Sequence, residues 1–206
     1  MHNGMLVEFE GGCRVAGLKD GTPVRDGDLL IWEHFSSVLS LRVLELHGKA
    51  LLRNESHDEV LFVLGEERSI YLPAGEMLEL DGDKTIVSAL TPQATTPAIQ
   101  PAGTPALQKT GDRWYVELIQ AEVTQFIGGI PPGRAPDHFH LYEEVICILD
   151  GSGIMHFGES STPIAAGSCI FLPRKQRHCV ENTGGGELRL LGVFYPAGSP
   201  AVRYPA

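Results

Sequence analysis

The stretch of sequence that decides the fold runs from residue 133 to residue 151 and reads Gly133-Arg-Ala-Pro-Asp-His138-Phe-His140-Leu-Tyr-Glu-Glu144-Val-Ile-Cys-Ile-Leu-Asp-Gly151. Its second half is a short apolar run, which is typical of a buried strand. In an extended chain alternate side chains point to the same face, so His138, His140 and Glu144 share one face. Glu143 falls on the opposite face. The spacing therefore predicts two imidazoles and one carboxylate that converge.

A second stretch supplies a third imidazole. It reads Gly167-Ser-Cys-Ile-Phe-Leu-Pro173-Arg-Lys-Gln-Arg-His178-Cys-Val-Glu-Asn182, an apolar strand, a turn marked by proline, and a histidine that opens the next strand. The chain has 8 histidines in 206 residues, so three at these positions beside a carboxylate in phase indicate a metal site. We predict that His138, His140, Glu144 and His178 are its ligands. The alternative is that they are core histidines with ordinary hydrogen bonds.

Together the two stretches resemble the paired motifs of the cupin superfamily. The first motif has Gly, a short gap, His-x-His, three residues, Glu, six residues and Gly. The second has Gly, five residues, Pro-x-Gly, two residues, His, three residues and Asn. Two positions depart from this pattern: the gap after Gly133 is one residue shorter, and Lys175 replaces a Gly. A left-handed Lys175 would cost about 1 kcal/mol. The resemblance implies a small antiparallel β-barrel, the double-stranded β-helix or jelly roll, that holds a metal on three His and one Glu.

The rest of the chain also predicts an all-β protein, because Gly (24) and Pro (14) separate short apolar runs and helical periodicity is weak. The segment 91–111 holds four prolines and few large apolar residues, as linkers do. The halves on either side repeat an apolar run that ends in Gly65 or Gly151. We therefore expect two tandem cupin-type β-barrels: a degenerate unit over 1–90 and the metal-binding cupin domain over 112–206.

Alignment of the glycines of the two halves tests whether the N-terminal half keeps the four ligand positions. Those positions are then occupied by Leu52, Asn54, Asp58 and Ile86. At most one of these is a good metal ligand, so we expect a metal-free unit that serves structure and assembly.

Composition narrows the classes of function. The chain has 16 Lys and Arg against 26 Asp and Glu, a net charge of −10, so nucleic-acid binding and anionic membrane surfaces are not expected. No apolar run approaches the roughly 20 residues that span a bilayer, and the first residues lack a signal-peptide pattern. The 4 cysteines show no CxxC spacing. We expect a cytoplasmic protein whose thiols are buried or half-buried and form no disulfide framework.

Two weaker features concern the cavity. Arg174, Lys175 and Arg177 crowd the turn before His178, and they would favour an anionic substrate if this turn borders the cavity. The simpler interpretation is a solvated turn. Gln125, on a predicted strand, could face the metal.

Three imidazoles and a carboxylate suit one divalent transition metal, with Fe expected first and Mn, Ni, Zn or Co as alternatives. Four protein ligands leave two neighbouring positions of an octahedral ion open to a chelating substrate, or to a substrate beside dioxygen. We therefore expect a metal-dependent enzyme that acts on a small organic molecule, first a dioxygenase-type oxidoreductase. The alternatives are a non-redox lyase, decarboxylase or isomerase, and a non-catalytic ligand-binding cupin. No catalytic residue is predicted beyond the metal ligands, and the resemblance implies a homodimer paired through sheet edges.

Overall fold

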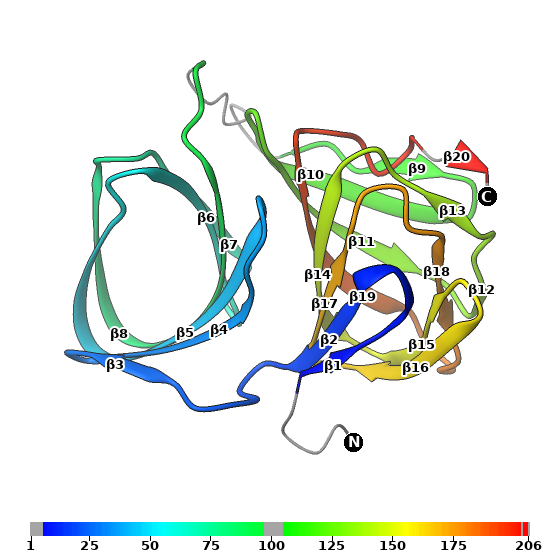
Figure 1. The fold of residues 1–206 in the computed structure, drawn as a ribbon, viewed down its shortest axis with the longest axis horizontal. Coiled ribbons are helices and arrows are strands. Elements are labelled where there is room, and N and C mark those ends of the chain that lie inside the picture. The colour runs from blue at the N-terminus through cyan, green and yellow to red at the C-terminus, as the bar shows by residue number, and fades with distance from the viewer. Residues whose placement is uncertain (1–5, 97–104, 203, 206) are drawn as a thin grey trace.

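The computed structural model describes residues 6–96, 105–202 and 204–205, so the middle of the predicted linker, residues 97–104, lies outside the described residues. The described part consists of β-strands and one 3-10 turn at Glu10–Gly12. It contains no helix that could cross a membrane. Figure 1 shows two barrels side by side, one built from the blue-to-green part of the chain and the other mainly from the green-to-red part. The prediction of an all-β chain with two tandem barrels is confirmed.

The N-terminal barrel is a single curled antiparallel sheet in the order β3-β4-β5-β8-β6-β7. Its strands are β3 (Val24–Asp26), β4 (Leu29–Phe35), β5 (Ser40–Arg53), β6 (His57–Val63), β7 (Arg68–Leu72) and β8 (Met77–Pro92). Alternation along these strands sends one set of aliphatic side chains into the barrel, where they form a closed apolar core.

Strands β5 and β8 are long, and each forms part of two walls of this barrel because it bends at a glycine. Gly48 and Gly82 are cross-strand partners, and both have positive φ, 128° and 85°. Such angles are open to glycine but strained for other residues. The sequence pattern predicts separate strands at Met77–Leu80 and Ile86–Leu90, and the structure joins them through this bend.

The C-terminal barrel consists of two facing sheets. The larger has the order β1-β2-β17-β14-β19-β11-β10-β9, and the smaller has the order β16-β15-β18-β13-β20 with β12 paired to β18. The strands of the larger sheet are β1 (Val7–Glu8), β2 (Arg14–Gly17), β9 (Gln108–Thr110), β10 (Arg113–Gln120), β11 (Thr124–Ile130), β14 (Glu143–Asp150), β17 (Ser168–Leu172) and β19 (Leu188–Tyr195). Those of the smaller sheet are β12 (Gly133–Arg134), β13 (His138–Phe139), β15 (Ser152–Phe157), β16 (Ser160–Ala165), β18 (His178–Asn182) and β20 (Tyr204–Pro205).

The first strands of the chain belong to the second barrel by hydrogen bonding. β2 pairs with β17, with Val15 opposite Ile170, and β1 pairs with β2. In Figure 1 these dark blue strands lie against the C-terminal barrel. The division of the sequence into units 1–90 and 112–206 does not anticipate this pairing.

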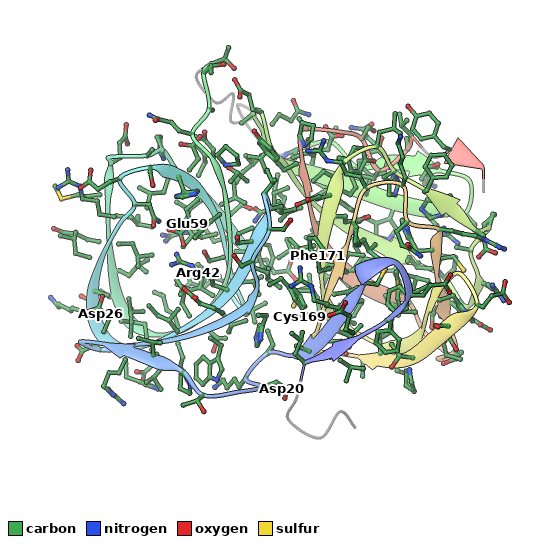
Figure 2. All side chains as sticks on the ribbon, in the orientation of Figure 1. Asp20, Asp26, Arg42, Glu59, Cys169 and Phe171 are labelled. Atoms are coloured by element: carbon green, nitrogen blue, oxygen red, sulfur yellow. The ribbon has the colours of Figure 1, made fainter. Side chains whose placement is uncertain are left out.

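The two barrels share an apolar core. Side chains from the outer faces of both barrels bury one another there, and Phe171 and Cys169 lie between the barrels in Figure 2. The N-terminal barrel contributes Phe35, Val43, Val60, Phe62 and Val87, and the C-terminal barrel contributes Ile119, Val145, Phe171, Leu191 and Val193. This shared core is continuous and contains fully buried side chains. We therefore expect the two barrels to behave as one folded body.

One end of the N-terminal barrel interior is polar. Glu59 has no exposed surface, and one of its carboxylate oxygens accepts a hydrogen bond from the Arg42 guanidinium at 2.7 Å. Asn54 and Ser88 also donate to this carboxylate. Arg42 and Glu59 are labelled inside the barrel in Figure 2. The buried charge is therefore paired and hydrogen-bonded, as burial requires.

Removal of the arginine tests this pairing. Arg42→Met leaves the carboxylate of Glu59 buried without its counter-charge, and we expect the free energy of unfolding to fall by about 3–5 kcal/mol. The double variant Arg42→Met, Glu59→Leu removes both charges and should recover most of this loss. Urea unfolding followed by tryptophan fluorescence measures both changes. A single variant as stable as the unmodified protein would contradict the assignment.

Candidate metal centre

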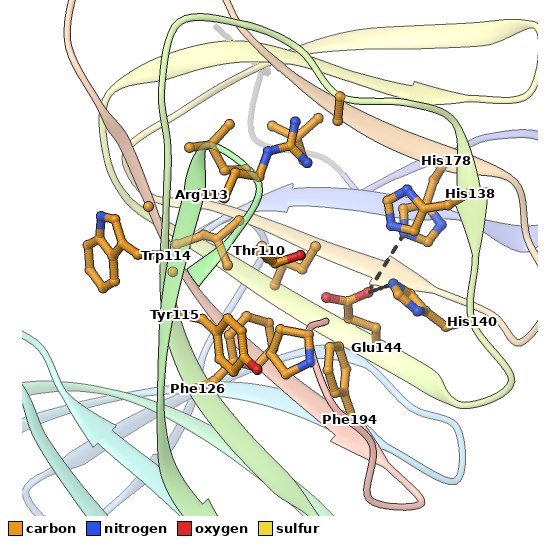
Figure 3. Close-up of a pocket in the computed structure, with 18 residues that line it drawn as sticks. Thr110, Arg113, Trp114, Tyr115, Phe126, His138, His140, Glu144, His178 and Phe194 are labelled. Carbon is orange, nitrogen blue, oxygen red and sulfur yellow. Dashed lines mark ion pairs between the residues drawn. The ribbon is translucent and has the colours of Figure 1, made fainter. Parts of the chain in front are cut away.

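The predicted ligands lie at a small cavity inside the C-terminal barrel. The cavity has a volume of about 90 Å³. One wall carries His138, His140, His178 and Glu144, and the opposite walls are mainly apolar (Figure 3). The apolar lining includes Phe126, Ile130, Ile146, Val180, Leu190 and Phe194.

The three histidines come from two paired segments. His138 in β13 is the cross-strand partner of His178 in β18, and His140 follows β13 directly. One ligand nitrogen from each ring lies within 4.8 Å of the others. His140 and His178 are buried and His138 is half-buried. The extended His-x-His segment thus places both of its rings on the inner face, as the alternation predicts.

Backbone carbonyls fix the orientation of two of these rings. His138 Nδ1 donates to the carbonyl of Pro136 at 3.0 Å, and His178 Nδ1 donates to the carbonyl of Gln176 at 2.8 Å. A carbonyl only accepts, so the proton sits on Nδ1 and the lone pair on Nε2. Burial, together with nearby His138, lowers the pKa of His178 to about 3, so this ring is neutral at pH 7. Both rings therefore present a ligand nitrogen.

Glu144 completes the group. Its Oε2 lies 3.6 Å from His140 Nε2 and 3.8 Å from His178 Nε2 (dashed lines in Figure 3), and the residue is 5% exposed. A buried carboxylate beside imidazole nitrogens favours the binding of a cation. Three nitrogens and one oxygen are also the donor set that divalent transition metals accept. The structure brings together all four predicted side chains, and their chemistry fits such an ion.

An ion pair ties the two ligand-bearing segments together. Asp137, next to His138, pairs with Arg177, next to His178, and it also contacts Arg134 at 3.3 Å. This ion pair lies outside the cavity. It therefore affects the position of the two histidines and does not contact a molecule bound in the cavity.

The basic turn does not border the cavity. Arg174 and Lys175 are exposed, and neither they nor Arg177 is among the lining residues. The simpler interpretation, a solvated turn, describes them better. Lys175 has φ 63° and its N–H donates to the carbonyl of His140 at 2.7 Å. The left-handed backbone expected at this position is therefore present, held by a hydrogen bond that supports a ligand residue.

The suggestion that Gln125 faces the metal is wrong. Its neighbour Phe126 lines the cavity, and the buried side chain of Gln125 points to the other barrel, where it accepts a hydrogen bond from Ser69. Alternation along β11 explains the difference, because successive side chains lie on opposite faces of the sheet.

Sequence reasoning missed one charged residue of the cavity. The guanidinium of Arg113 lines it, in Figure 3 to the left of the histidines, and the side chain is only 12% exposed. Arg113 starts β10 one residue before the strand predicted at Trp114–Ile119. Its neighbours Trp114 and Tyr115 also line the cavity, so alternation along the strand does not single Arg113 out, and the sequence holds no signal for it.

The N-terminal barrel contains four positions that correspond to the four candidate ligands. Their register differs from the one that we predict from the sequence. Leu52 and Leu78 are cross-strand partners in the way that His138 and His178 are. Leu78 therefore occupies the position of His178, and the assignment of that position to Ile86 is wrong. The glycine alignment failed because it set Gly75 on Gly167, whereas the hydrogen bond from Gly75 to Asn54 makes Gly75 the counterpart of Lys175.

The second histidine position was assigned correctly. The carbonyl of Asn54 accepts a hydrogen bond from the N–H of Gly75 at 2.6 Å. The carbonyl of His140 accepts from Lys175 in the same way, at 2.7 Å. Asn54 thus takes the position of His140.

The carboxylate position belongs to Glu59, not to Asp58. Glu59 pairs with Leu72, just as Glu144 pairs with Leu172, and each of these leucines precedes a proline. The irregular register near the end of β14 adds one residue there, which displaced the alignment by one. The N-terminal barrel therefore has Leu, Asn, Glu and Leu at the four positions, with Arg42 on the glutamate.

Comparison with known proteins agrees with this architecture. The model of the cupin domain matches residues 126–194. The oxalate-binding protein of Thermotoga maritima is 38% identical over 67 residues, which are 32% of this chain and 55% of that protein. The matched curated relatives are covered over 37% to 55% of their own length.

Solved structures extend the likeness to both barrels. A structural genomics target from Pseudomonas aeruginosa has a TM-score of 0.71 at 14% identity, with 96% of this chain and 94% of that chain covered. Oxalate decarboxylase of Bacillus subtilis, a protein with Mn(II) centres, has a TM-score of 0.61 at 13% identity, with 90% and 78% covered. At this identity the likeness concerns the fold. Residues 126–194 of this chain match the cupin domain, and the chain as a whole shares the two-barrel fold of these solved structures.

Proposed function

We propose that the C-terminal barrel is a divalent-metal-dependent enzyme that acts on a small carboxylic acid. The observation that carries this proposal is the placement of Arg113 in the same cavity as three histidines and Glu144. Arg113 carries one positive charge, and a metal ion held by the three histidines and Glu144 would carry another. An anion bound between them would contact both. An arginine in this setting favours carboxylate, because its planar fork matches two carboxylate oxygens.

The size of the cavity limits the substrate. Its volume is about 90 Å³, whereas an engineered cavity of roughly 150 Å³ binds benzene. A molecule of a few heavy atoms fits within this volume, and a larger one would extend through the open side of the cavity. The oxalate-binding protein of Thermotoga maritima supports the same class by its name.

The residues of the cavity divide the work. His138, His140, His178 and Glu144 would hold the metal, which when bound supplies Lewis-acid polarisation of a substrate oxygen. Arg113 orients the substrate through its carboxylate. The aromatic and aliphatic walls exclude water, which strengthens the charge interactions inside.

The geometry favours non-redox chemistry, such as decarboxylation, as the first candidate reaction. The small cavity accommodates one small acid more readily than an acid beside dioxygen. The dioxygenase-type reaction predicted from the sequence is the second candidate, supported by the two open positions that four protein ligands leave on an octahedral ion. The first class uses an ion such as Mn(II), and the second uses iron.

Metal content tests the ligands. The unmodified protein, purified without chelators, should carry about one divalent transition metal per chain, and the double variant His138→Ala, His140→Ala should carry almost none, because half of the donor set is gone. Elemental analysis measures both. His47→Ala is the control, since His47 is exposed on the N-terminal barrel. Full metal content in the double variant would show that the site is wrong.

Substrate binding tests Arg113. With oxalate as the probe and Mn(II)-loaded protein, Arg113→Met should weaken binding about 10- to 100-fold, the loss of a charge-assisted hydrogen bond of about 1.5–3 kcal/mol. Arg113→Lys should fall in between, because a lysine keeps the charge but not the fork. Arg174→Met serves as the matched control on the exposed turn. Isothermal titration calorimetry measures each Kd, and an unchanged Kd for Arg113→Met would refute the role.

Oxygen dependence separates the two reaction classes. We expect turnover of small di- and oxo-carboxylic acids under anaerobic conditions. CO2 is released, and a proton is transferred to the carbon atom that carried the released carboxylate. An oxygen electrode and a CO2 assay on the same protein samples measure this. Consumption of oxygen in proportion to substrate, with no anaerobic turnover, would instead establish the dioxygenase-type reaction.

A further inference from the structure

The N-terminal barrel contacts the strand that carries the metal-binding carboxylate. Glu143 and Glu144 are consecutive residues at the start of β14, and alternation sends their side chains in opposite directions. Glu144 faces the cavity. Glu143 faces the other barrel, where Oε1 accepts from the Ser37 hydroxyl and Oε2 from the Leu39 N–H, both at 2.9 Å.

The loop that makes this contact is itself fixed. Leu39 lies at the end of the loop between β4 and β5, and its side chain is completely buried in the core between the barrels. Phe35 at the other end of the loop contacts Phe171, with ring centroids 6.0 Å apart. A buried backbone N–H needs an acceptor, and for Leu39 that acceptor is Glu143. The loop therefore cannot shift without losing both packing and a hydrogen bond.

The candidate ligand, by contrast, lies near a strand end. Glu144 is the second residue of β14 and the first that pairs with both β17 and β19, whereas Glu143 pairs with β19 alone and follows a bend at residues 141–142. Strand ends are the first parts of a sheet to open. The contact at Glu143 thus supports the first residue of the strand, which has a partner strand on one side only, one residue from the carboxylate that faces the histidines.

We propose that Glu143 is a positioning residue, through which the N-terminal barrel holds Glu144 at the metal site. This inference rests on the proposed metal-binding function for its consequence but not for its geometry. It also gives the N-terminal barrel a role at the site, because Ser37 and Leu39 belong to that barrel.

The chain offers a matched control for the loss of such a contact. Glu122, in the turn between β10 and β11, accepts hydrogen bonds from the N–H groups of Thr95 and Thr96 at 2.9 and 3.1 Å. Those threonines follow the last strand of the N-terminal barrel. Glu122 thus makes the same kind of contact, but its turn carries no metal ligand.

The test compares Glu143→Ala, Glu143→Gln and Glu122→Ala. In metal-free protein, Glu143→Ala should speed hydrogen exchange at the amides of Glu144 and Val145 about tenfold, and it should weaken Mn(II) binding measured by calorimetry about tenfold. Glu143→Gln should restore both, because an amide can accept from Leu39 and donate to Ser37. Glu122→Ala should change neither.

Each outcome decides the proposal. Unchanged exchange in Glu143→Ala overturns it, and so does an equal effect of Glu122→Ala, which would reveal general loosening of the two barrels. Failure of Glu143→Gln to rescue also overturns it. If the unmodified protein binds no metal, the proposed function fails, while hydrogen exchange in the metal-free protein still decides whether Glu143 positions Glu144.

Discussion

Each barrel buries one glutamate at the same place on its inner wall, and a carboxylate in such a place is costly unless a positive partner neutralises it. In the N-terminal barrel Arg42 is that partner, at 2.7 Å from Glu59. In the C-terminal barrel the neighbours of Glu144 are imidazoles, and the ring of His178 is neutral at pH 7. A neutral ring offers a lone pair but no charge, so a metal ion bound here would supply the positive charge that Arg42 supplies to Glu59. The proposed difference between the two barrels thus concerns how one buried carboxylate is balanced.

That the four candidate ligands lie together was predictable because their spacing has a simple geometric meaning. A strand has a period of two residues, so two histidines separated by one residue and a carboxylate in phase lie on the same face. The last histidine follows a proline turn and begins the next strand. The all-β fold followed from the short apolar runs separated by Gly and Pro, and the number of barrels followed from the linker and from the apolar run that repeats on either side of it. These features depend on contacts that are short in sequence or that repeat.

What could not be predicted depends on contacts between segments remote in sequence. Arg113 reaches the cavity because β10 pairs with β11, and nothing near Arg113 in the sequence marks it as part of a site. Glu59 was displaced by one residue because the irregularity in β14 is set by its partner β19. The orientation of the Gln125 side chain was predicted wrongly because the sequence does not show which face of the sheet packs against the other barrel. That face is decided only when the two barrels come together. A one-residue change of register reverses every side chain of a strand, so such errors are large in effect.

The pairing of β2 with β17 has a consequence for how the molecule is made. Residues 14–17 and residues 168–171 are joined across almost the whole chain, and the N-terminal barrel lies between them in sequence as if inserted into the C-terminal one. Contacts of such long separation slow folding, because a large loop must close before they form. During synthesis the first barrel can fold early, whereas β2 can pair with β17 only after residues 168–171 have left the ribosome. The sheet that holds Glu144 is therefore completed only after the whole N-terminal barrel has been made.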